Sequence, residues 1–230
     1  MNFALLMPAA GSGVRLGANR PKALIEIAGS ALFVHALKPF IECRELTETI
    51  IAAPAGYEDE FRRIVEREFP QKAIRVVTGG ATRQESVSRA LRELTNDAVL
   101  IHDAARVLVT PDLIRRVLNA LRDNVVAVVP GIPIADTVKR FAGDPAVVTE
   151  TVDRRQLTAV QTPQAILYKI AVDAYRRAEV SGYLGTDDVS LVEHFQAGTV
   201  RLVEGDSRNF KITTREDLER ARTLLEQPRR

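Results

Sequence analysis

The sequence lacks the features that mark several specialised classes of protein. Among its 230 residues is a single cysteine, Cys43, which excludes an internal disulfide framework and a cysteine-based zinc site. No apolar run approaches the ~20 residues of a membrane span. The first eight residues lack the basic region and the apolar length of a signal peptide. The net charge of +2 does not suggest a dedicated nucleic-acid binder. We therefore expect a soluble, cytoplasmic protein.

The composition is that of an ordinary folded domain. Hydrophobic residues make up 46% and charged residues 27% of the chain, which excludes a disordered protein. The chain has no internal repeat and no low-complexity segment. A chain of this length can bury a good core, so we expect one domain spanning residues 1–230.

Short apolar runs alternate with amphipathic stretches along the chain. The runs are rich in Val and Ile, which is typical of parallel strands covered on both faces; they are Phe3–Met7, Thr49–Ala53, Ile74–Val77, Val99–His102, Val125–Val129 and Thr199–Val203. Helices are predicted around residues 57–65, 87–94, 114–121, 166–177, 187–196 and 214–225, with Thr110, Thr186 and Thr213 or Thr214 as N-caps. The pattern predicts an α/β fold with a doubly wound, mostly parallel sheet, whose ligands bind beyond the carboxyl ends of the strands.

Residues 134–156 interrupt this alternation. Two partly apolar stretches, 134–141 and 147–152, flank the turn residues Gly143-Asp144-Pro145 and carry no helical stripe. This pattern predicts a β-hairpin arm. Because an isolated hairpin is marginally stable in water, we expect the arm to pack on a second subunit; a surface hairpin on its own domain is the alternative.

The first candidate site directly follows the first predicted strand and runs Pro8-Ala9-Ala10-Gly11-Ser12-Gly13-Val14-Arg15-Leu16-Gly17, then Arg20-Pro21-Lys22. Small residues let backbone N–H groups approach phosphate oxygens closely, and Arg15 and Lys22 add positive charge. A dinucleotide-binding turn is disfavoured because Leu16 replaces its third glycine and a short strand, Leu24–Ile27, follows. The loop therefore predicts a polyphosphate site.

Two further stretches follow predicted strands. Gly79-Gly80-Ala81-Thr82-Arg83-Gln84-Glu85-Ser86 combines glycines, which allow close contact with a base or ribose, with the first turn of a helix, which favours anions. In His102-Asp103-Ala104-Ala105-Arg106, Asp103 is suited to hold Mg²⁺ and Arg106 to grip a phosphate. His102 is predicted to be a packed, hydrogen-bonded residue.

A fourth group is scattered along the chain and supplies hydroxyls and cations suited to a phosphorylated polyol. It comprises Asp136-Thr137, Thr151-Val152-Asp153-Arg154, Gln161-Thr162-Pro163-Gln164 and Asn209-Phe210-Lys211-Ile212-Thr213.

In this order the four groups resemble the 2-C-methyl-D-erythritol 4-phosphate cytidylyltransferase family of the non-mevalonate isoprenoid pathway. The motif that ends at Arg15 is shared by the wider nucleotidyltransferase superfamily, whereas 102–106, 151–154 and 161–164 are more specific. The resemblance implies a Rossmann-like nucleotidyltransferase fold with a protruding arm, a homodimer, Mg²⁺ or another divalent cation, and transfer of CMP from CTP to methylerythritol phosphate.

The resemblance also implies roles for individual residues. The expected catalytic residues are Arg15, Lys22, Arg154 and Lys211. The expected nucleotide-binding residues are Pro8, Ala9, Ala10, Gly11, Gly13, Gly79, Gly80, Ala81, Arg83, Ser86, Asp103 and Ala104. The acceptor is expected to contact Asp103, Arg106, Thr137, Arg154, Thr162 and Lys211, with Thr137 and Arg154 reaching a neighbouring subunit, and Asp103 is the expected metal ligand.

Three positions depart from the family pattern. Ala81 replaces an acidic or polar residue, which affects base selectivity if a side chain makes that contact. Val107 replaces a proline, which would loosen its turn. Arg208 stands where an acidic residue is common, so a second carboxylate near the metal is missing. For Asp187 and Asp188, first-turn acids on a helix are the simpler account.

Four other functions remain open on the residues alone. A ribitol-5-phosphate cytidylyltransferase would share the glycine loop and the Asp-Ala-x-Arg pattern, although Ala105 and the 151–154 run favour methylerythritol phosphate. A sugar-1-phosphate nucleotidyltransferase would use another base. A non-catalytic nucleotide-sensing module would lack turnover, and a dehydrogenase would bind a nicotinamide cofactor.

Overall fold

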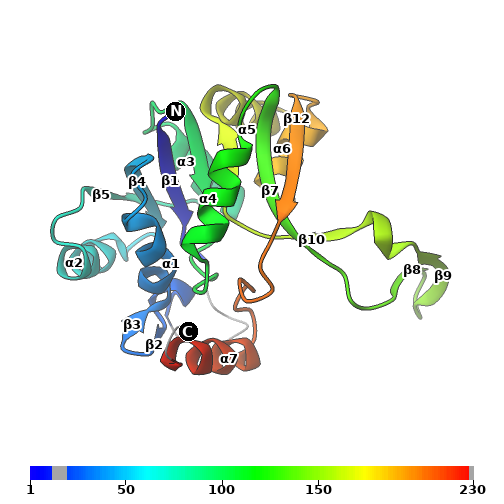
Figure 1. The fold of residues 1–230 in the computed structure, drawn as a ribbon, viewed down its shortest axis with the longest axis horizontal. Helices are drawn as coiled ribbons and strands as arrows, with labels where there is room; N and C mark the ends of the chain where they lie inside the picture. Colours follow the sequence, from blue (N-terminus) through cyan, green and yellow to red (C-terminus); the bar gives the residue numbers. More distant parts are fainter. Residues whose placement is uncertain (12–19, 228–230) are drawn as a thin grey trace.

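A computed structural model describes residues 1–11 and 20–227, and its central element is an eight-stranded sheet (Figure 1). The strand order is β10-β7-β11-β6-β1-β4-β5, and β12 also pairs with β7. The bounds are β1 Phe3–Pro8, β4 Leu46–Ala53, β5 Ile74–Thr78, β6 Ala98–Ile101, β7 Val125–Pro133, β10 Thr158–Val160, β11 Gln164–Leu167 and β12 Thr199–Glu204. Strand pairs β1–β4, β1–β6, β4–β5 and β7–β12 are parallel, whereas β10 and β11 run antiparallel to their neighbours. The prediction of a mostly parallel sheet is confirmed.

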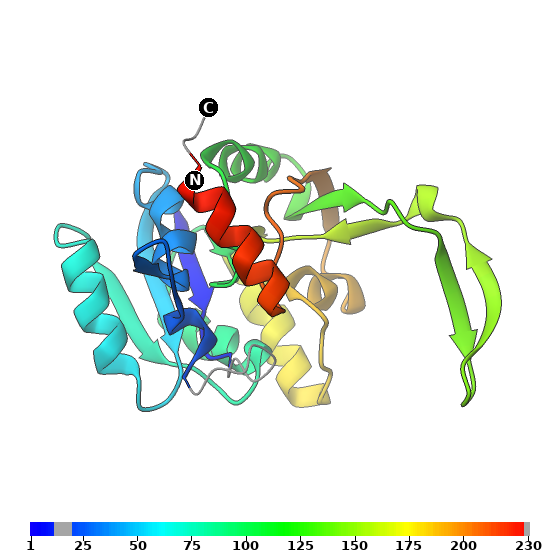
Figure 2. The ribbon, with the colours of Figure 1, turned by 90° about the horizontal axis from the view of Figure 1, so that it is seen from below.

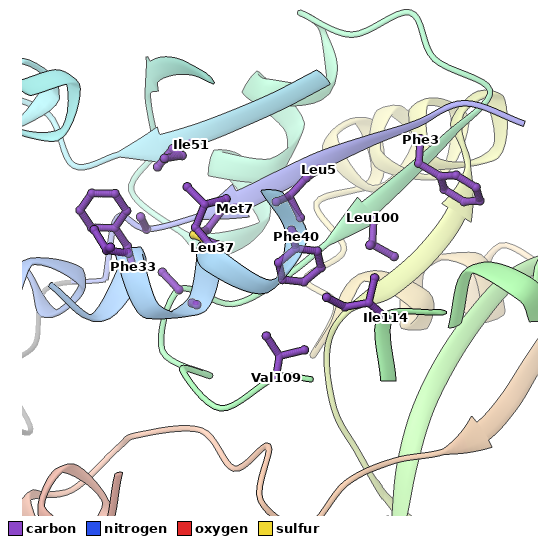
Figure 3. Close-up of a cluster of buried hydrophobic side chains, with 14 of the residues drawn as sticks. Phe3, Leu5, Met7, Phe33, Leu37, Phe40, Ile51, Leu100, Val109 and Ile114 are labelled. Atoms are coloured by element: carbon purple, nitrogen blue, oxygen red, sulfur yellow. The ribbon is translucent and has the colours of Figure 1, made fainter. Parts of the chain in front are cut away.

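Helices cover both faces of this sheet, as expected for strands that are apolar throughout. One face carries α1 Leu32–Ile41, α2 Glu58–Glu68 and α4 Pro111–Ala120, and the other carries α3 Arg83–Leu91, α5 Tyr168–Ser181 and α6 Asp188–His194. Side chains alternate along a strand, so Leu5 and Met7 of β1 pack on the first face and Leu6 on the second. Figure 3 shows Phe33 and Phe40 of α1 in the first of these cores.

A third, smaller cluster lies beneath the carboxyl edge of the sheet. It joins the C-terminal helix α7, Arg215–Glu226, to the short β2–β3 hairpin, Glu26–Ile27 and Ser30–Ala31 (Figure 1). Ile212, which precedes α7, is fully buried there. The chain leading to α7 is therefore held close to the loops at that edge.

Two of the three predicted helix N-caps are confirmed. Thr110 accepts a hydrogen bond from Leu113 N, and Thr214 forms a capping box with Asp217. The prediction for Thr186 is wrong, because Asp187 caps α6 through Ser190. The helix α3 begins at Arg83, which lies in its first turn as predicted, and Thr82 is an N-cap that the sequence analysis did not name.

Some predicted boundaries also need correction. The predicted helix 166–177 begins with β11, and the helix α5 starts at Tyr168. The predicted strand Leu24–Ile27 is a 3-10 turn, Lys22–Leu24, followed by the two-residue strand β2. The helix α1 has no counterpart in the sequence prediction.

The predicted hairpin arm is present. Strands β8, Val138–Ala142, and β9, Val147–Val152, pair with each other in a separate two-stranded sheet, followed by the turn η3, Arg154–Gln156. Figure 2 shows the arm projecting away from the large sheet. Its Phe141, Val147 and Val148 side chains are about 60% exposed or more. In the described ranges, no helix is both long and apolar enough to cross a membrane.

Candidate active site

The loops at the carboxyl edge of the sheet surround a cavity of about 410 Å³. Segments from five parts of the chain line it: the loops after β1, β5 and β6, the 3-10 turn Lys22–Leu24, and the stretch before α7. The lining residues are Pro8, Ala9, Ala10, Gly11, Lys22, Ala23, Gly80, Ala81, Thr82, Arg83, Ser86, Asp103, Ala104, Ala105, Lys211 and Thr213. The structure therefore brings together twelve residues predicted for the site, and the predicted Gly13 and Arg15 lie outside the described residues.

Close packing explains the glycines at this edge. A Cβ atom on Gly79 would lie 2.9 Å from Ala10 Cβ and 3.0 Å from Ser86 Oγ. One on Gly80 would lie within about 2.5 Å of the Glu85 side chain. The absence of a side chain at Gly79 therefore lets the loop after β5 approach the loop after β1, and its absence at Gly80 lets this loop pack against Glu85. Gly79 itself supports the cavity without lining it.

Hydrogen bonds fix the loop after β5. Ser86 is fully buried, and its hydroxyl accepts from Gly80 N at 3.0 Å and donates to Thr82 O at 2.8 Å. The backbone N–H of Ala81 donates to Glu85 Oε2 at 2.8 Å. The methyl group of Ala81 adds no polar contact, so the polar groups of this loop at the cavity come from its backbone and from Thr82, Arg83 and Ser86.

Asp103 is the only acidic residue lining the cavity in the described part of the chain, and two cations hold it. Its Oδ1 accepts from Arg83 Nε at 2.9 Å, and its Oδ2 lies 2.8 Å from Lys211 Nζ. Burial raises the pKa of this carboxyl, but Arg83 and Lys211 outweigh burial and hold the pKa well below its usual range. Asp103 is therefore a carboxylate near neutral pH.

A buried ion pair behind the cavity was missed by the sequence reading. Both oxygens of Asp188 accept from Arg83, at 2.7 and 2.6 Å, and the Tyr175 hydroxyl donates to the same carboxylate. Asp188 is fully buried, so it is more than a first-turn acid. Burial opposes the charge on Arg83, but Asp188 and Asp103 raise its pKa well above the ordinary value. No sequence pattern links Arg83 to a residue 105 positions away.

Two predicted acceptor contacts lie behind Asp103 and do not line the cavity. Thr162 is 3% exposed, and its hydroxyl accepts from Asp103 N at 3.1 Å. Arg106 Nε lies 3.9 Å from Asp103 Oδ2. The other two predicted contacts, Thr137 and Arg154, belong to the arm, and Arg154 donates to the carbonyl oxygen of Ala135. Within one chain the arm residues do not join the cavity.

His102 is buried as predicted, and its surroundings set its charge. Nδ1 lies 3.0 Å from Thr162 Oγ1, and Nε2 lies 3.1 Å from the carbonyl oxygen of Arg106. Burial lowers the pKa of His102 to about 4. The imidazole is therefore neutral near pH 7 and serves as a hydrogen-bonding bridge.

This low pKa predicts a loss of stability in acid. The unfolded histidine takes up a proton near pH 6.5, whereas the folded one does so only near pH 4. The His102 contribution is constant above pH 6.5, and the free energy of unfolding then falls by about 3 kcal/mol as the pH decreases to 4. An NMR titration of the His102 ring measures this directly. A ring that titrates near pH 6.5 in the folded protein contradicts the assignment.

The donor set fits a magnesium ion that is held mainly by its substrate. Mg²⁺ is often bound by one or two carboxylates together with phosphate oxygens and water. Asp103 supplies a carboxylate, and no cluster of three His, Cys, Asp or Glu side chains suited to a metal occurs among the described residues. Arg208 is exposed and adds no acidic group there. The ligands beyond Asp103 would then come from phosphate and water.

The remaining departure from the family pattern is accommodated by packing. Val107 is 2% exposed and belongs to the cluster beneath the sheet edge, where it packs with Leu32 and Ile212. The turn before it is closed by a hydrogen bond of 3.0 Å from Arg106 N to the carbonyl oxygen of Asp103. The expected loosening of this turn is therefore not seen.

The sheet and the cavity at its carboxyl edge indicate a nucleotidyltransferase. Comparison with known proteins agrees with this class. The family model for 2-C-methyl-D-erythritol 4-phosphate cytidylyltransferase matches residues 3–227. The chain belongs to this family of enzymes and has its Rossmann-like nucleotidyltransferase fold.

Individual relatives support the same assignment over nearly the whole chain. The cytidylyltransferase of Symbiobacterium thermophilum is 40% identical, covering 98% of this chain and 94% of its own, and that of Bacillus velezensis is 37% identical, covering 98% and 96%. Among solved structures, 4-diphosphocytidyl-2C-methyl-D-erythritol synthase from Anaerococcus prevotii has a TM-score of 0.86 at 31% identity, covering 98% of this chain and 99% of its own. The Thermus thermophilus cytidylyltransferase has a TM-score of 0.79 at 31% identity, covering 99% and 100%.

Proposed function

We propose that this enzyme transfers CMP from CTP to 2-C-methyl-D-erythritol 4-phosphate. A phosphate oxygen of the acceptor attacks the α-phosphorus of CTP in line with the bond to the β-phosphate. That bond breaks, and pyrophosphate leaves with its electrons. The observation that carries the proposal is the convergence of Lys22, Lys211 and Asp103 on one cavity beside the backbone of residues 8–11. Membership in the family supplies the identity of the two substrates.

The cations of the cavity would stabilise the charge that develops at the α-phosphate. Such transfer depends mainly on positioning and electrostatic stabilisation. Lys22 and Lys211 line the cavity from two segments far apart in the sequence, and Arg15 is proposed to join them. Lys211 is held by its 2.8 Å contact with Asp103, so its charge is already oriented before the substrates bind.

Asp103 is proposed to hold Mg²⁺ together with phosphate oxygens. A bound divalent cation would neutralise charge on the triphosphate and favour departure of pyrophosphate. In the absence of substrate the Asp103 carboxylate is compensated by Arg83 and Lys211. The phosphate of the acceptor would supply a new partner for Lys211, which leaves the carboxylate open to the metal.

The cytidine half of CTP is proposed to lie against the loop after β5. Gly80 and Ala81 offer backbone atoms there, and Ser86 offers a hydroxyl. Since Ala81 has no polar side chain, base selection would depend on the backbone and on Ser86. CTP is a cytoplasmic metabolite, so a cytoplasmic location belongs to this proposal.

A homodimer joined through the arm is also part of the proposal. The arm pairs with no other strand in the described part of the chain and exposes Phe141, Val147 and Val148. Apolar surface of this kind is typical of an interface. Thr137 and Arg154 lie on the arm and do not line the cavity of their own chain. Arg154 of the partner subunit would then complete the acceptor site.

Mixed dimers test this arrangement. The variants Arg154→Ala and Lys22→Ala are each expected to be nearly inactive alone. When their subunits are mixed equally, half of the dimers are hybrids, and each hybrid has one site with both residues intact. Activity should therefore recover to about a quarter of the wild-type value. Activity no higher than that of the separate variants, despite confirmed subunit exchange, would argue against a shared site.

A substrate panel tests the reaction itself. Pyrophosphate release is measured with each of the four common ribonucleoside triphosphates and with methylerythritol phosphate or ribitol 5-phosphate as acceptor. Turnover is expected with CTP and methylerythritol phosphate. Turnover with ribitol phosphate alone, or binding of CTP without turnover, overturns the proposal.

A further inference from the structure

Four residues at the carboxyl edge of the sheet, three of them buried and Arg106 partly buried, close a ring of hydrogen bonds. The ring passes from His102 Nε2 to the carbonyl oxygen of Arg106 (3.1 Å) and from the Arg106 guanidinium to the carbonyl oxygen of Asn209 (2.8 Å). It continues from the Asn209 amide to the carbonyl oxygen of Thr162 (2.7 Å) and from the Thr162 hydroxyl to His102 Nδ1 (3.0 Å). The ring ties together three loops that are far apart in the sequence.

The polar residues of the ring are more deeply buried than polar residues of an ordinary surface loop. His102 and Asn209 are fully buried, and none of Asn209, His102 and Thr162 lines the cavity. Buried polar groups are costly unless they are hydrogen-bonded, so a closed ring holds its members in one arrangement. The hydrogen bonds of the ring therefore explain why these positions carry polar residues, and no direct contact with substrate is needed.

Each side of the ring supports a group of the cavity. Asp103 N donates to the Thr162 hydroxyl at 3.1 Å, which fixes the backbone that carries the carboxylate. Lys211 follows Asn209 by two residues and contacts Asp103. Arg106 uses one guanidinium nitrogen on Asn209, and its buried Nε has no hydrogen-bond partner. Arg106 is thus held in place behind Asp103, with its Nε 3.9 Å from the carboxylate oxygen Oδ2.

We propose that this ring positions Arg106 and Lys211 for the phosphate of the acceptor, and that Asn209 and His102 are positioning residues for that substrate. The inference rests on the proposed function. The contacts fixed by the ring belong to the loops after β6 and before α7, whereas the loop after β5 is fixed by its own Ser86 and Glu85. The ring therefore governs the acceptor half of the site and leaves the cytidine half unchanged.

The variant Asn209→Asp tests the proposal with little change of shape. It replaces the amide donor by a carboxylate facing the carbonyl oxygen of Thr162. The KM for methylerythritol phosphate should rise tenfold or more, while the KM for CTP and the affinity for CTP by calorimetry change less than threefold. The variant Asn209→Ala removes the donor without adding charge and should show the same split.

Gln161→Glu is the matched control. Gln161 is 3% exposed and joins the same two loops through Asp206, with Gln161 Nε2 to Asp206 O at 2.8 Å and Asp206 N to Gln161 Oε1 at 3.1 Å, but it lies outside the ring. If the ring acts specifically, this variant leaves the acceptor KM within about threefold of the wild type. An equal rise in the acceptor KM in Gln161→Glu would mean that any hydrogen bond between these two loops has the same effect, which would overturn the proposal.

The remaining outcomes are also decisive. Equal rises in both KM values with a lower melting temperature, or no change in the acceptor KM, contradict the proposal. If Asn209→Asp does not fold, the split in Asn209→Ala decides. The proposed function and the proposed role of the ring can be rejected independently. Wild-type turnover with the acceptor tests the function, and the difference between the KM changes for the acceptor and for CTP in the variants tests the role of the ring.

Discussion

Replacing Asp103 by asparagine is expected to lower kcat by about 1,000-fold or more. The change removes the carboxylate proposed to hold Mg²⁺, leaves Lys211 without its counter-charge and leaves Arg83 paired with Asp188 alone. Steady-state pyrophosphate release over a range of Mg²⁺ concentrations measures the effect, and added Mg²⁺ should not restore the rate.

Asp188→Asn is the informative comparison for Asp103→Asn. It removes the other carboxylate that pairs with Arg83 but leaves the proposed metal ligand in place. Breaking a buried ion pair costs about 3–5 kcal/mol, so the main effect should be on the free energy of unfolding. If Asp103→Asn kept a tenth of the wild-type kcat, Asp103 would not be the metal ligand.

Replacing Lys22 by alanine is expected to lower kcat by about 100- to 1,000-fold with a much smaller loss of CTP affinity. The lysine lines the cavity beside residues 8–11, where its charge is proposed to act mainly on the transition state. Single-turnover kinetics and calorimetric CTP titration separate the two effects. Lys38→Ala, which removes an exposed lysine of α1, should match the wild type in both measurements.

Proportional losses of rate and CTP affinity would contradict this role for Lys22. They would mean that the lysine binds the ground state and the transition state equally well. The loop after β1 would then serve as a binding site for the triphosphate, and the catalytic charge would have to come from elsewhere in the cavity.

Much of the sheet could be predicted because its strands are covered on both faces. The runs at 3–7, 49–53 and 125–129 are almost continuously apolar, which is not the pattern of amphipathic surface segments. Parallel strands place their carboxyl ends at one edge, so the loops after them could be expected to meet. The same argument predicted that Lys22 and Asp103 lie close together, and both line the cavity.

The elements that were assigned wrongly are those whose secondary structure depends on contacts with distant parts of the chain. The segment Gln164–Leu167 has apolar residues compatible with a helix, but it is placed between β6 and β7 as an antiparallel strand. Helix α1 is apolar on most sides and contains Pro39, so it shows neither a clear stripe nor a clean helical composition. Local pattern carries no information about which strands a segment will join.

The buried contacts behind the site could not be predicted from the sequence either. Asp188 follows an N-cap residue and has the sequence context of a surface acid, yet it is buried against Arg83. Asn209 is one polar residue among many before α7 until the fold brings it to Thr162. Such long-range pairs depend on how loops from different strands meet, and one sequence does not encode that in any short motif.

Tracing the oxygen of the acceptor tests the central claim most directly. Methylerythritol phosphate labelled with ¹⁸O in its phosphate is incubated with CTP, Mg²⁺ and the enzyme, and the products are examined by ³¹P NMR and mass spectrometry. The account predicts a diphosphate product with ¹⁸O in the bridge between the two phosphorus atoms, and unlabelled pyrophosphate. Label in the released pyrophosphate, or CTP left unchanged, would contradict it.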